Sequence, residues 1–371
     1  MENKNAYQAQ LFSNRLAKNY RQLKKWARKN RISCWRLYDR DIPEVPLCLD
    51  MYTFLPDEID SKIEAARYYQ ELNAAISENS PQAESMVREE LERTFIHMYL
   101  YERPYDKPEE EEELWLGEMQ KAAAEVLSVR PENIIVKRRR HQTENKTRSQ
   151  YNRMESSRSV TGTVMEQGQL FSVNLTDYID SGLFFDHRPL RSTVRSQCGA
   201  KRVLNLFCYT GAFSVYSAEG GASYVESVDM SNTYMDWARR NMELNGFCDK
   251  KKYAYTAGDA VKFLSEREKE LKDKGEEKFD IIILDPPTFS NSKKTDTLLD
   301  INRDWPMLVK KCTALLSDRG ILYFSTNSRK LVFDDKKLPE NYAAREITAQ
   351  TIPEDYRNAK IHRAWAITKK V

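Results

Sequence analysis

The sequence contains no apolar stretch that approaches the ~18 uninterrupted residues a membrane-spanning helix needs. Its first residues, MENKNAYQAQLFSNRL, have no basic cluster followed by an apolar core, so no secretory signal is expected. Apolar residues nevertheless make up 40% of the 371 positions, and charged residues make up 31%. This balance predicts a soluble, cytoplasmic protein with no membrane partner, and the length suffices for two domains.

Paired metal-binding side chains are also missing. The six cysteines are scattered without a CxxC pair, and none of the four histidines lies four residues from another. These spacings argue against a zinc site and against a disulfide framework. We therefore expect reduced, mostly buried thiols and no metal cofactor.

Charge is unevenly distributed along the chain, although the net charge is only +3. Residues 1–40 carry 11 Lys and Arg against 2 Asp and Glu, whereas residues 41–130 carry 8 against 22. Residues 131–160 return to 8 against 3. Two basic blocks on either side of an acidic block indicate a face suited to a polyanion.

The first part of the chain is interpreted as an α+β domain over residues 1–185. Residues 8–30 place apolar side chains at helical spacing opposite a face of Lys and Arg, which is either a solvated face or one that lies against phosphates. Further patterns predict two short strands in 34–55, helices over 57–79 and 81–126, a strand in 131–142 and a hairpin in 160–185. A basic cluster ends the strand in 131–142 and opens a polar loop that we expect to contact RNA: Lys137, Arg138, Arg139 and Arg140.

From residue 186 the pattern changes to apolar runs that alternate with amphipathic segments. Strands are expected at 202–207, 223–229, 252–260, 279–287 and 320–328, followed by two closing strands at 345–353 and 362–370. Helices are expected between most of these strands. Such alternation predicts an α/β domain over 186–371 with a doubly wound, mostly parallel sheet.

The ends of these strands suggest the cofactor, because ligands of such sheets bind beyond the carboxyl ends of the strands. The turn NLFCYTG has one glycine, Gly211, where a dinucleotide fingerprint has three, so NAD and FAD are not expected. Asp229 ends the second strand and suits the hydroxyls of a ribose, or alternatively a helix cap. Asp259, after the third strand, suits an adenine amino group. These residues suit a cofactor that contains a nucleoside but no pyrophosphate. S-adenosylmethionine is such a cofactor, and we expect it here.

The fourth strand ends in the motif Asp285-Pro286-Pro287-Thr288-Phe289. A double proline fixes two φ angles and removes two backbone donors, so the carbonyls and the adjacent carboxylate are held rigidly towards a ligand. We expect these five residues to be catalytic. Phe289 is either a stacking platform for a base or a buried core aromatic.

These motifs resemble those of class I methyltransferases that act on bacterial large-subunit ribosomal RNA. The closest resemblance is to the guanine-N7 methyltransferase that forms the C-terminal half of a bifunctional enzyme, and it covers nearly the whole chain. The stretches that carry it are FSNRLAKNYRQLKKWARKNRISCWRLYDRDIPE, VNLTDYIDSGLFFDHRPLR, LNLFCYTGAFSVYSAEGGA, VDMSNTYMDWARRNMELNG, FDIIILDPPTFSNSKK and FSTNSRK. The N-terminal half of that enzyme, with its RNA-binding module, has no counterpart here. The resemblance implies a Rossmann-like methyltransferase domain and an N-terminal RNA-recognition domain.

The resemblance also implies the cofactor contacts. Residues at the methionine end of S-adenosylmethionine would be Asn205, Phe207, Tyr209 and Gly211. The nucleoside end would be held by Asp229 at the ribose, Met230 on the adenine, and Asp259 with Ala260 at the base. Asp285 would border the same site. Arg188 would pair with the carboxylate of the cofactor and Asp186 would orient it, with a structural salt bridge between the two as the alternative.

The reaction type is narrowed by which side chains the motifs offer. Methylation of cytosine C5 needs a cysteine thiolate, and the stretch Tyr323–Ser328 has none. Methylation of an exocyclic amine favours an aromatic directly after Pro-Pro, where this chain has Thr288. Guanine N7 carries a lone pair and needs no general base, only in-line placement and charge stabilisation, and no histidine is expected at this centre.

We therefore expect transfer of a methyl group to guanine N7 of 23S rRNA, or of an assembling large subunit, without a covalent intermediate. RNA contacts near the site are expected from Asn291, Lys293, Asn327 and Arg329, although the lysine equally suits a solvated loop tip. Two alternatives remain open. One is methylation of another base atom, such as an exocyclic amine or cytosine C5, and the other is an RNA-binding factor for ribosome assembly.

Overall fold

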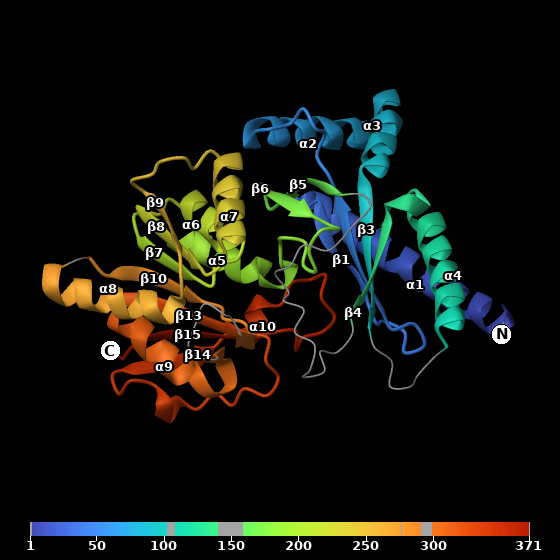
Figure 1. The fold of residues 1–371 in the computed structure, drawn as a ribbon. Coiled ribbons are helices and arrows are strands. Elements are labelled where there is room, and N and C mark those ends of the chain that lie inside the picture. Colours follow the sequence, from blue (N-terminus) through green and yellow to red (C-terminus); the bar gives the residue numbers. More distant parts are fainter. Residues whose placement is uncertain (1, 102–107, 140–158, 276, 291–298, 371) are drawn as a thin grey trace. The chain divides into compact units, whose positions relative to one another are not determined.

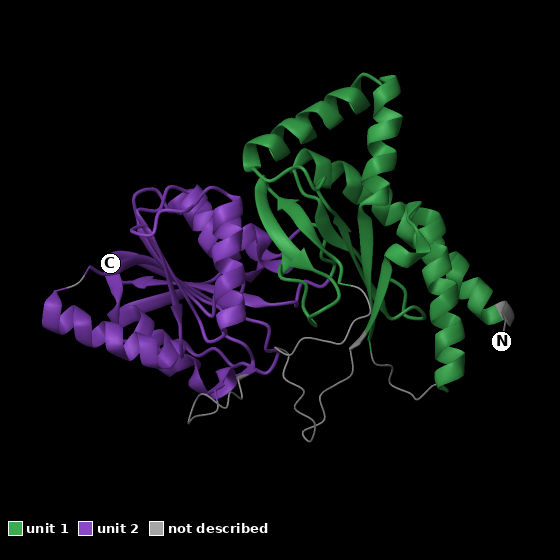
Figure 2. Ribbon diagram, turned by 45° about the horizontal axis from the view of Figure 1, so that its top comes forward, with its two compact units in different colours: residues 1–185, 354–357 green, residues 186–353, 358–371 purple. Residues whose placement is uncertain are grey.

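The computed structural model describes residues 2–101, 108–139, 159–275, 277–290 and 299–370. Contacts between residues divide the chain into two units (Figure 2). Unit 1 comprises residues 1–185 and 354–357, and unit 2 comprises residues 186–353 and 358–371. No helix among the described residues is long and apolar enough to cross a membrane.

Unit 1 is built on a four-stranded sheet in the order β1-β2-β3-β4, with β1 to β3 antiparallel and β4 parallel to β3. The strands are β1 (Cys34–Asp39), β2 (Leu47–Thr53), β3 (Thr94–Tyr101) and β4 (Ile134–Arg139). Its helices are α1 (Glu2–Lys29), α2 (Lys62–Ser77), α3 (Pro81–Glu92) and α4 (Glu109–Leu127). A hairpin of β5 (Thr161–Glu166) and β6 (Gln169–Asn174) completes the unit.

The basic N-terminal helix is confirmed as α1, and it covers the sheet together with α4 (Figure 1). Its apolar face packs into the core through Phe12 and Leu16, which meet Trp115 of α4 and residues of the sheet. Removing so much apolar surface from water stabilises the unit by roughly 25 cal/mol per Å² buried. The charged face of α1 is thereby left towards solvent.

The predicted helix over 81–126 is wrong in its middle, because residues 94–101 form the strand β3. The run TFIHMYLY is buried along nearly its whole length, and it lies between β2 and β4. A strand covered on both faces has no alternation of polar and apolar side chains to mark it. The acidic helical patterns on either side therefore predict one helix across it. The hairpin and the two strands expected in 34–55 are confirmed.

Unit 2 contains a seven-stranded sheet in which five neighbouring strands are parallel, while the last strand of the chain runs antiparallel to both of its neighbours, one of which is an edge strand. In sheet order the strands are β14 (Tyr342–Glu346), β15 (Arg363–Lys369), β13 (Leu316–Thr326), β10 (Phe279–Leu284), β7 (Arg202–Leu206), β8 (Tyr224–Asp229) and β9 (Tyr253–Ala257). The helices are α5 (Arg188–Gln197), α6 (Ala212–Glu219), α7 (Asn232–Leu244), α8 (Ala260–Lys274), α9 (Ile301–Ala314) and the short α10 (Thr348–Thr351). The predicted doubly wound α/β sheet is confirmed.

Helices cover both faces of this sheet, as the side chains of β10 illustrate. Ile281 and Ile283 pack with residues of α5 and α6, whereas Ile282 and Leu284 pack with residues of α8 and α9. Alternate side chains of a strand point to opposite faces, so a continuous apolar run is needed at the centre of such a sheet.

The closing strand predicted at 345–353 is wrong for most of its length. The strand β14 ends at Glu346, and residues 348–351 form α10. Ile and Thr residues favour a strand locally, but the pairing of β14 with β15 ends at Glu346 and Trp365, only two residues from the start of β15, so little of the partner strand remains to extend the ladder. Residues 354–357, placed by sequence in the second domain, belong to unit 1, where Asp355 accepts a hydrogen bond from the backbone N–H of Arg36 at 2.9 Å.

Candidate active site

The candidate site lies at one edge of the unit 2 sheet. Because β7, β8, β9, β10 and β13 are parallel, their carboxyl ends meet at the same edge. The segments that leave this edge contain most of the residues singled out in the sequence. Such edges are where open α/β sheets bind their ligands.

The loop after β7 has an unusual backbone. Phe207 and Tyr209 have φ values of 54° and 52°, a region that residues other than glycine rarely adopt. Gly211 has φ 75°, and a Cβ there would lie 2.8 Å from the Cβ of Ala238 in α7, so glycine is required. Strained loops of this kind persist where surrounding contacts fix them, and they cluster at ligand sites.

Asp229, at the end of β8, fixes this loop. Its Oδ2 accepts a hydrogen bond from the backbone N–H of Tyr209 at 3.0 Å, and its Oδ1 accepts one from the N–H of Ser231 at 3.0 Å. Burial raises the pKa of Asp229, and these backbone donors oppose that rise. Each carboxylate oxygen keeps a second lone pair for a hydroxyl group.

The remaining residues expected at the cofactor lie around this loop. Asn205 is fully buried in β7 and its amide donates to Ser214 Oγ at 2.9 Å, so it supports the loop from inside the unit. Asp259 caps α8 by accepting from the N–H of Lys262 at 2.8 Å. Ala260 is buried and Met230 is half-buried.

The Asp285 carboxylate, which follows β10, is contacted by two side chains. Ser325 of β13 donates its hydroxyl to Oδ1 at 2.6 Å. The Nε2 atom of His187 lies 3.3 Å from Oδ2. The Asp285 side chain remains 30% exposed, so it is both held and accessible.

Thr288 and Phe289 complete the motif. The Thr288 hydroxyl donates to Asn327 Oδ1 at 2.7 Å, which joins the segment after β10 to the segment after β13. Phe289 begins the short strand β11 (Phe289–Ser290), which pairs with β12 (Leu299–Asp300). The Phe289 side chain is 60% exposed, so Phe289 is not the buried core aromatic that the sequence left as an alternative.

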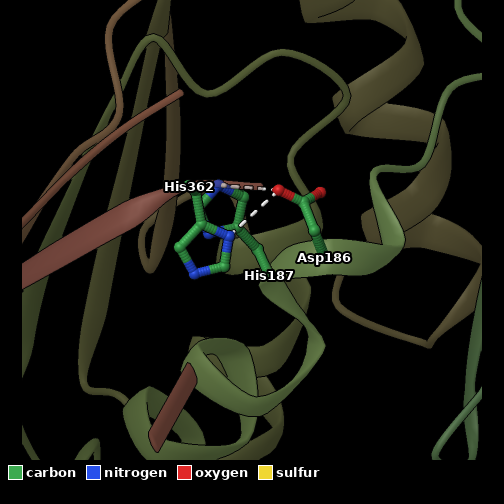
Figure 3. A group of neighbouring side chains, drawn as sticks. All are labelled: Asp186, His187 and His362. Carbon is green, nitrogen blue, oxygen red and sulfur yellow. Dashed lines mark hydrogen bonds and ion pairs between the residues drawn. The ribbon is translucent and has the colours of Figure 1, made fainter. Parts of the chain in front are cut away.

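A histidine at this centre was not expected, and the structure corrects that expectation. His187 is buried and its ring stacks on that of His362, with centroids 4.5 Å apart and an interplanar angle of 14° (Figure 3). Asp186 Oδ2 lies 3.1 Å from Nδ1 of His362 and 3.8 Å from Nε2 of His187. His187 stands in the stretch FFDHRPLR, so its sequence position beside Arg188 was the available signal. Arg188 begins α5 and is itself buried.

These three side chains do not converge on one point in the way that metal ligands do. Ligand atoms of Asp186, His187 and His362 lie within 4.8 Å of one another. The lone pairs of stacked imidazoles, however, lie in two nearly parallel planes, and both nitrogens of His362 already face partners, Asp186 and Thr351. The arrangement within the described residues is that of a hydrogen-bonded cluster.

Cysteine is unsuited to act as a nucleophile at this edge. Burial raises the pKa of the Cys208 thiol, and the charge of Asp229 raises it further. Burial also raises the pKa of Cys312, which lies inside α9. A thiol with a raised pKa is a poor source of thiolate at neutral pH.

The predicted RNA contacts have different placements. Asn327 and Arg329 are exposed after β13. The ammonium of Lys137 donates to the backbone carbonyls of Tyr178 and Ile179 inside unit 1. Arg138 and Arg139 end β4, and Arg140, Asn291 and Lys293 lie outside the described residues.

Comparison with known proteins identifies the class. A family model described as S-adenosylmethionine-dependent methyltransferase matches residues 81–359. One similar solved structure is that of a candidate methyltransferase complexed with SAH. The match covers 97% of this chain and 81% of that chain, with a TM-score of 0.66 at 18% sequence identity, and it shows that the two have the same fold. The chain therefore belongs to the S-adenosylmethionine-dependent methyltransferases, and S-adenosylmethionine is its cofactor.

Curated relatives narrow this class. The chain is 41% identical over 359 residues to the ribosomal RNA large subunit methyltransferase K of Neisseria meningitidis, covering 97% of this chain and 87% of that protein. It is 40% identical to the methyltransferase K/L of Stutzerimonas stutzeri, of which it spans 42% of the length. Within the class, the chain belongs to the family of the methyltransferase K proteins.

Proposed function

We propose that this protein transfers a methyl group from S-adenosylmethionine to N7 of a guanine in 23S rRNA, either naked or in an assembling large subunit. Relatives over nearly the whole chain are named for large-subunit ribosomal RNA. The observation that carries the choice of atom is the set of side chains around the motif. Phe289 is an exposed aromatic, Ser325 holds the Asp285 carboxylate, and Thr288 orients the Asn327 amide. The motif itself offers no thiolate among the described residues.

Residues at the sheet edge suit the cofactor. The loop from Phe207 to Gly211 would hold the methionine end, and Asp229 the ribose hydroxyls through its remaining lone pairs. Met230 would pack on the adenine, Asp259 and Ala260 would contact the base, and Asp186 with Arg188 would close over the site. The cofactor supplies an electrophilic methyl group on a sulfonium, which needs a nucleophile in line with the bond that breaks.

A guanine N7 meets this need without a proton acceptor. Its lone pair is already available, so the protein has to place the base and stabilise the positive charge that spreads over the ring. Phe289 offers an exposed ring for stacking, a contact worth about 1–3 kcal/mol per base. The Asp285 carboxylate would orient the base and stabilise the developing charge.

The Thr288–Asn327 pair favours guanine over adenine. The Asn327 atom that faces Thr288 is its carbonyl oxygen, which accepts the Thr288 hydroxyl at 2.7 Å. The outer atom of this exposed amide is therefore an N–H donor. Guanine presents the acceptor O6 beside N7, whereas adenine presents an amino group there.

A basic stripe on α1 supports RNA as the substrate. Lys18, Arg21, Lys25 and Lys29 recur at intervals of three or four residues, so they share one face of the helix. All four are exposed, and none has an ion-pair partner among the described residues.

Changing all four to Gln should reduce the slope of log K for RNA binding against log salt by about 3. Matched changes at Lys262, Lys269, Lys272 and Lys274 of α8 should leave the slope closer to that of the parent protein.

A second candidate reaction is methylation of an exocyclic amine. His187 favours it, because burial lowers its pKa, and beside a neutral imidazole the Asp285 carboxylate is the stronger base for the proton that an amine loses. Such a reaction should slow as His187 becomes protonated, whereas transfer to N7 should not need that group as an acceptor.

The deciding experiment is incubation of the protein with labelled S-adenosylmethionine and unmodified 23S rRNA, followed by mass spectrometry of the nucleosides. N7-methylguanosine is the expected product. Another methylated nucleoside would overturn the choice of atom while leaving the family intact. A ribosome-assembly role would be favoured instead if Asp285→Ala abolished methylation but fully restored assembly in a deletion strain.

A further inference from the structure

His187 lies beside the proposed catalytic carboxylate of Asp285. It is buried, and the polar atoms that its Nε2 faces among the described residues are carboxylate oxygens, Asp285 Oδ2 at 3.3 Å and Asp186 Oδ2 at 3.8 Å. Carboxylates accept hydrogen bonds and do not donate them when ionised, so the ring hydrogen must be on Nε2. Burial lowers the pKa of His187 although both aspartates oppose the shift, which favours the neutral ring. Its buried Nδ1 has no hydrogen-bond partner among the described residues.

The plane of the His187 ring is fixed by its neighbours. His362 stacks against it, as Figure 3 shows. His362 is in turn held at both nitrogens, with Nδ1 3.1 Å from Asp186 and Nε2 2.9 Å from the Thr351 hydroxyl. The ring of Phe213 in α6 lies 5.9 Å from His187 by its centroid. The Nε2 atom of His187 is therefore held in a fixed place, 3.3 Å from Asp285 Oδ2.

We infer that His187 is a positioning residue that holds the Asp285 carboxylate through its Nε2–H group, while Ser325 holds the other oxygen. The 3.3 Å separation is longer than an ordinary N–H···O bond, as catalytic contacts often are before the substrate is bound. With one donor on each oxygen, the carboxylate is restricted to one orientation and keeps a lone pair on each oxygen for the base. His362 and Asp186 act through His187 by fixing its ring. This inference rests on the role proposed for Asp285.

Two variants of His187 separate positioning from packing. His187→Phe keeps a ring against His362 but removes the donor, and it should lower kcat by about 10–100-fold, the effect of a catalytic group displaced by ~1 Å. The KM for S-adenosylmethionine should change by less than about twofold. His187→Gln offers an amide N–H near the place of Nε2–H and should recover part of the lost kcat. Tyr323→Phe is the matched control, since it removes a partly buried hydrogen bond of 2.8 Å between β13 of the same sheet and Gln197 of α5 without touching Asp285.

A spectroscopic test does not depend on any RNA substrate. The chain has only four histidines, so a protein labelled with ¹⁵N-histidine gives few ring signals, and His187→Gln assigns those of His187. The expected tautomer carries its hydrogen on Nε2. Asp285→Asn should lower the pKa of His187 further, because the charge of Asp285 raises it in the parent protein.

The outcomes separate this inference from the proposed function. An Nδ1–H tautomer, or a His187 pKa unchanged in Asp285→Asn, would overturn the inference even if the protein methylates guanine N7. Equal kcat for His187→Phe and the parent protein would overturn it too. A protein that fails to methylate 23S rRNA but shows the expected tautomer and pKa change would disprove the proposed substrate and leave the pairing of His187 with Asp285 established.

Discussion

Asp229 and Asp285 both end parallel strands of one sheet, yet they are held by different kinds of donor. Asp229 accepts two backbone N–H groups, from Tyr209 and Ser231. Asp285 is contacted by two side chains, Ser325 and His187. Backbone donors follow from the path of the chain and survive most substitutions, whereas side-chain donors can be removed one at a time. The comparison suggests that binding of the cofactor depends on the fold itself and that the chemical step depends on a few replaceable side chains.

The largest effect is expected when the side-chain-held carboxylate is neutralised. Asp285→Asn should reduce kcat by roughly 100-fold, because the charge that stabilises the transition state is lost. The Kd for S-adenosylmethionine should stay close to that of the parent protein. Labelled methyl transfer at saturating cofactor and titration calorimetry measure the two quantities. The control is Asp273→Asn, at an exposed position of α8. Full activity of Asp285→Asn would refute the idea that the chemical step depends on this carboxylate.

Neutralising Asp229, the carboxylate held by backbone donors, should instead change the Kd for S-adenosylmethionine and leave kcat nearly unchanged. Asp229→Asn weakens charge-assisted hydrogen bonds worth about 1.5–3 kcal/mol, so the Kd for S-adenosylmethionine should rise by roughly 10–100-fold. At saturating cofactor kcat should be nearly retained. A fall in kcat with an unchanged Kd would instead place Asp229 in the chemical step.

Two serine-to-alanine changes test the same comparison between Asp229 and Asp285, and we expect their effects to be smaller. Ser325→Ala removes one donor to Asp285 and should lower kcat by about tenfold, with little change in the free energy of unfolding. Ser231→Ala removes the hydroxyl that accepts the N–H of Tyr234 at the start of α7 and should cost about 1 kcal/mol of stability. The backbone N–H that Ser231 gives to Asp229 remains, so its kcat should not change. Urea denaturation and methyl transfer of both variants, side by side, test this pair.

The smallest effect is a pH dependence of stability due to His187. Its pKa in the folded protein is lower than the value of about 6.5 expected in the unfolded chain. The unfolded state therefore binds the proton more tightly, and the contribution of His187 is fully present above that value and is lost as the pH falls towards the folded pKa. His187→Gln should show a shallower loss of unfolding free energy between about pH 7 and 5. Parallel slopes for the two proteins would show that other groups cause the loss.

Local patterns in the sequence were sufficient for much of the fold. Alternating apolar runs and amphipathic segments predicted the sheet of unit 2 and the strand-end positions of Asp229 and Asp285, because parallel strands bring their carboxyl ends to one edge. The single glycine after β7 and the acids at the strand ends predicted S-adenosylmethionine as the cofactor, which the family match confirms. The strand β3 was missed, since a strand buried on both faces has no alternation to reveal it.

The histidine cluster shows what the sequence did not reveal. His187 stands between Asp186 and Arg188, for which roles are expected from the sequence, but His362 has no such neighbour, and nothing in the spacing of the two histidines pairs them. They come together because β15 lies next to β13 in the sheet, which brings the start of the last strand close to the segment that precedes α5. Tertiary packing of this kind also decided that Phe289 is exposed and that Lys137 is used within unit 1.

By itself, the sequence determined the class of each region: a basic helix, an α/β sheet, and acidic side chains at the ends of its strands. These follow from periodicity and chain direction, which are local properties. Only the tertiary structure decided which donors hold each carboxylate, because hydrogen bonds join residues that are distant in the chain and are set by strand order and burial. The Asp285 carboxylate between Ser325 and His187 is the clearest case.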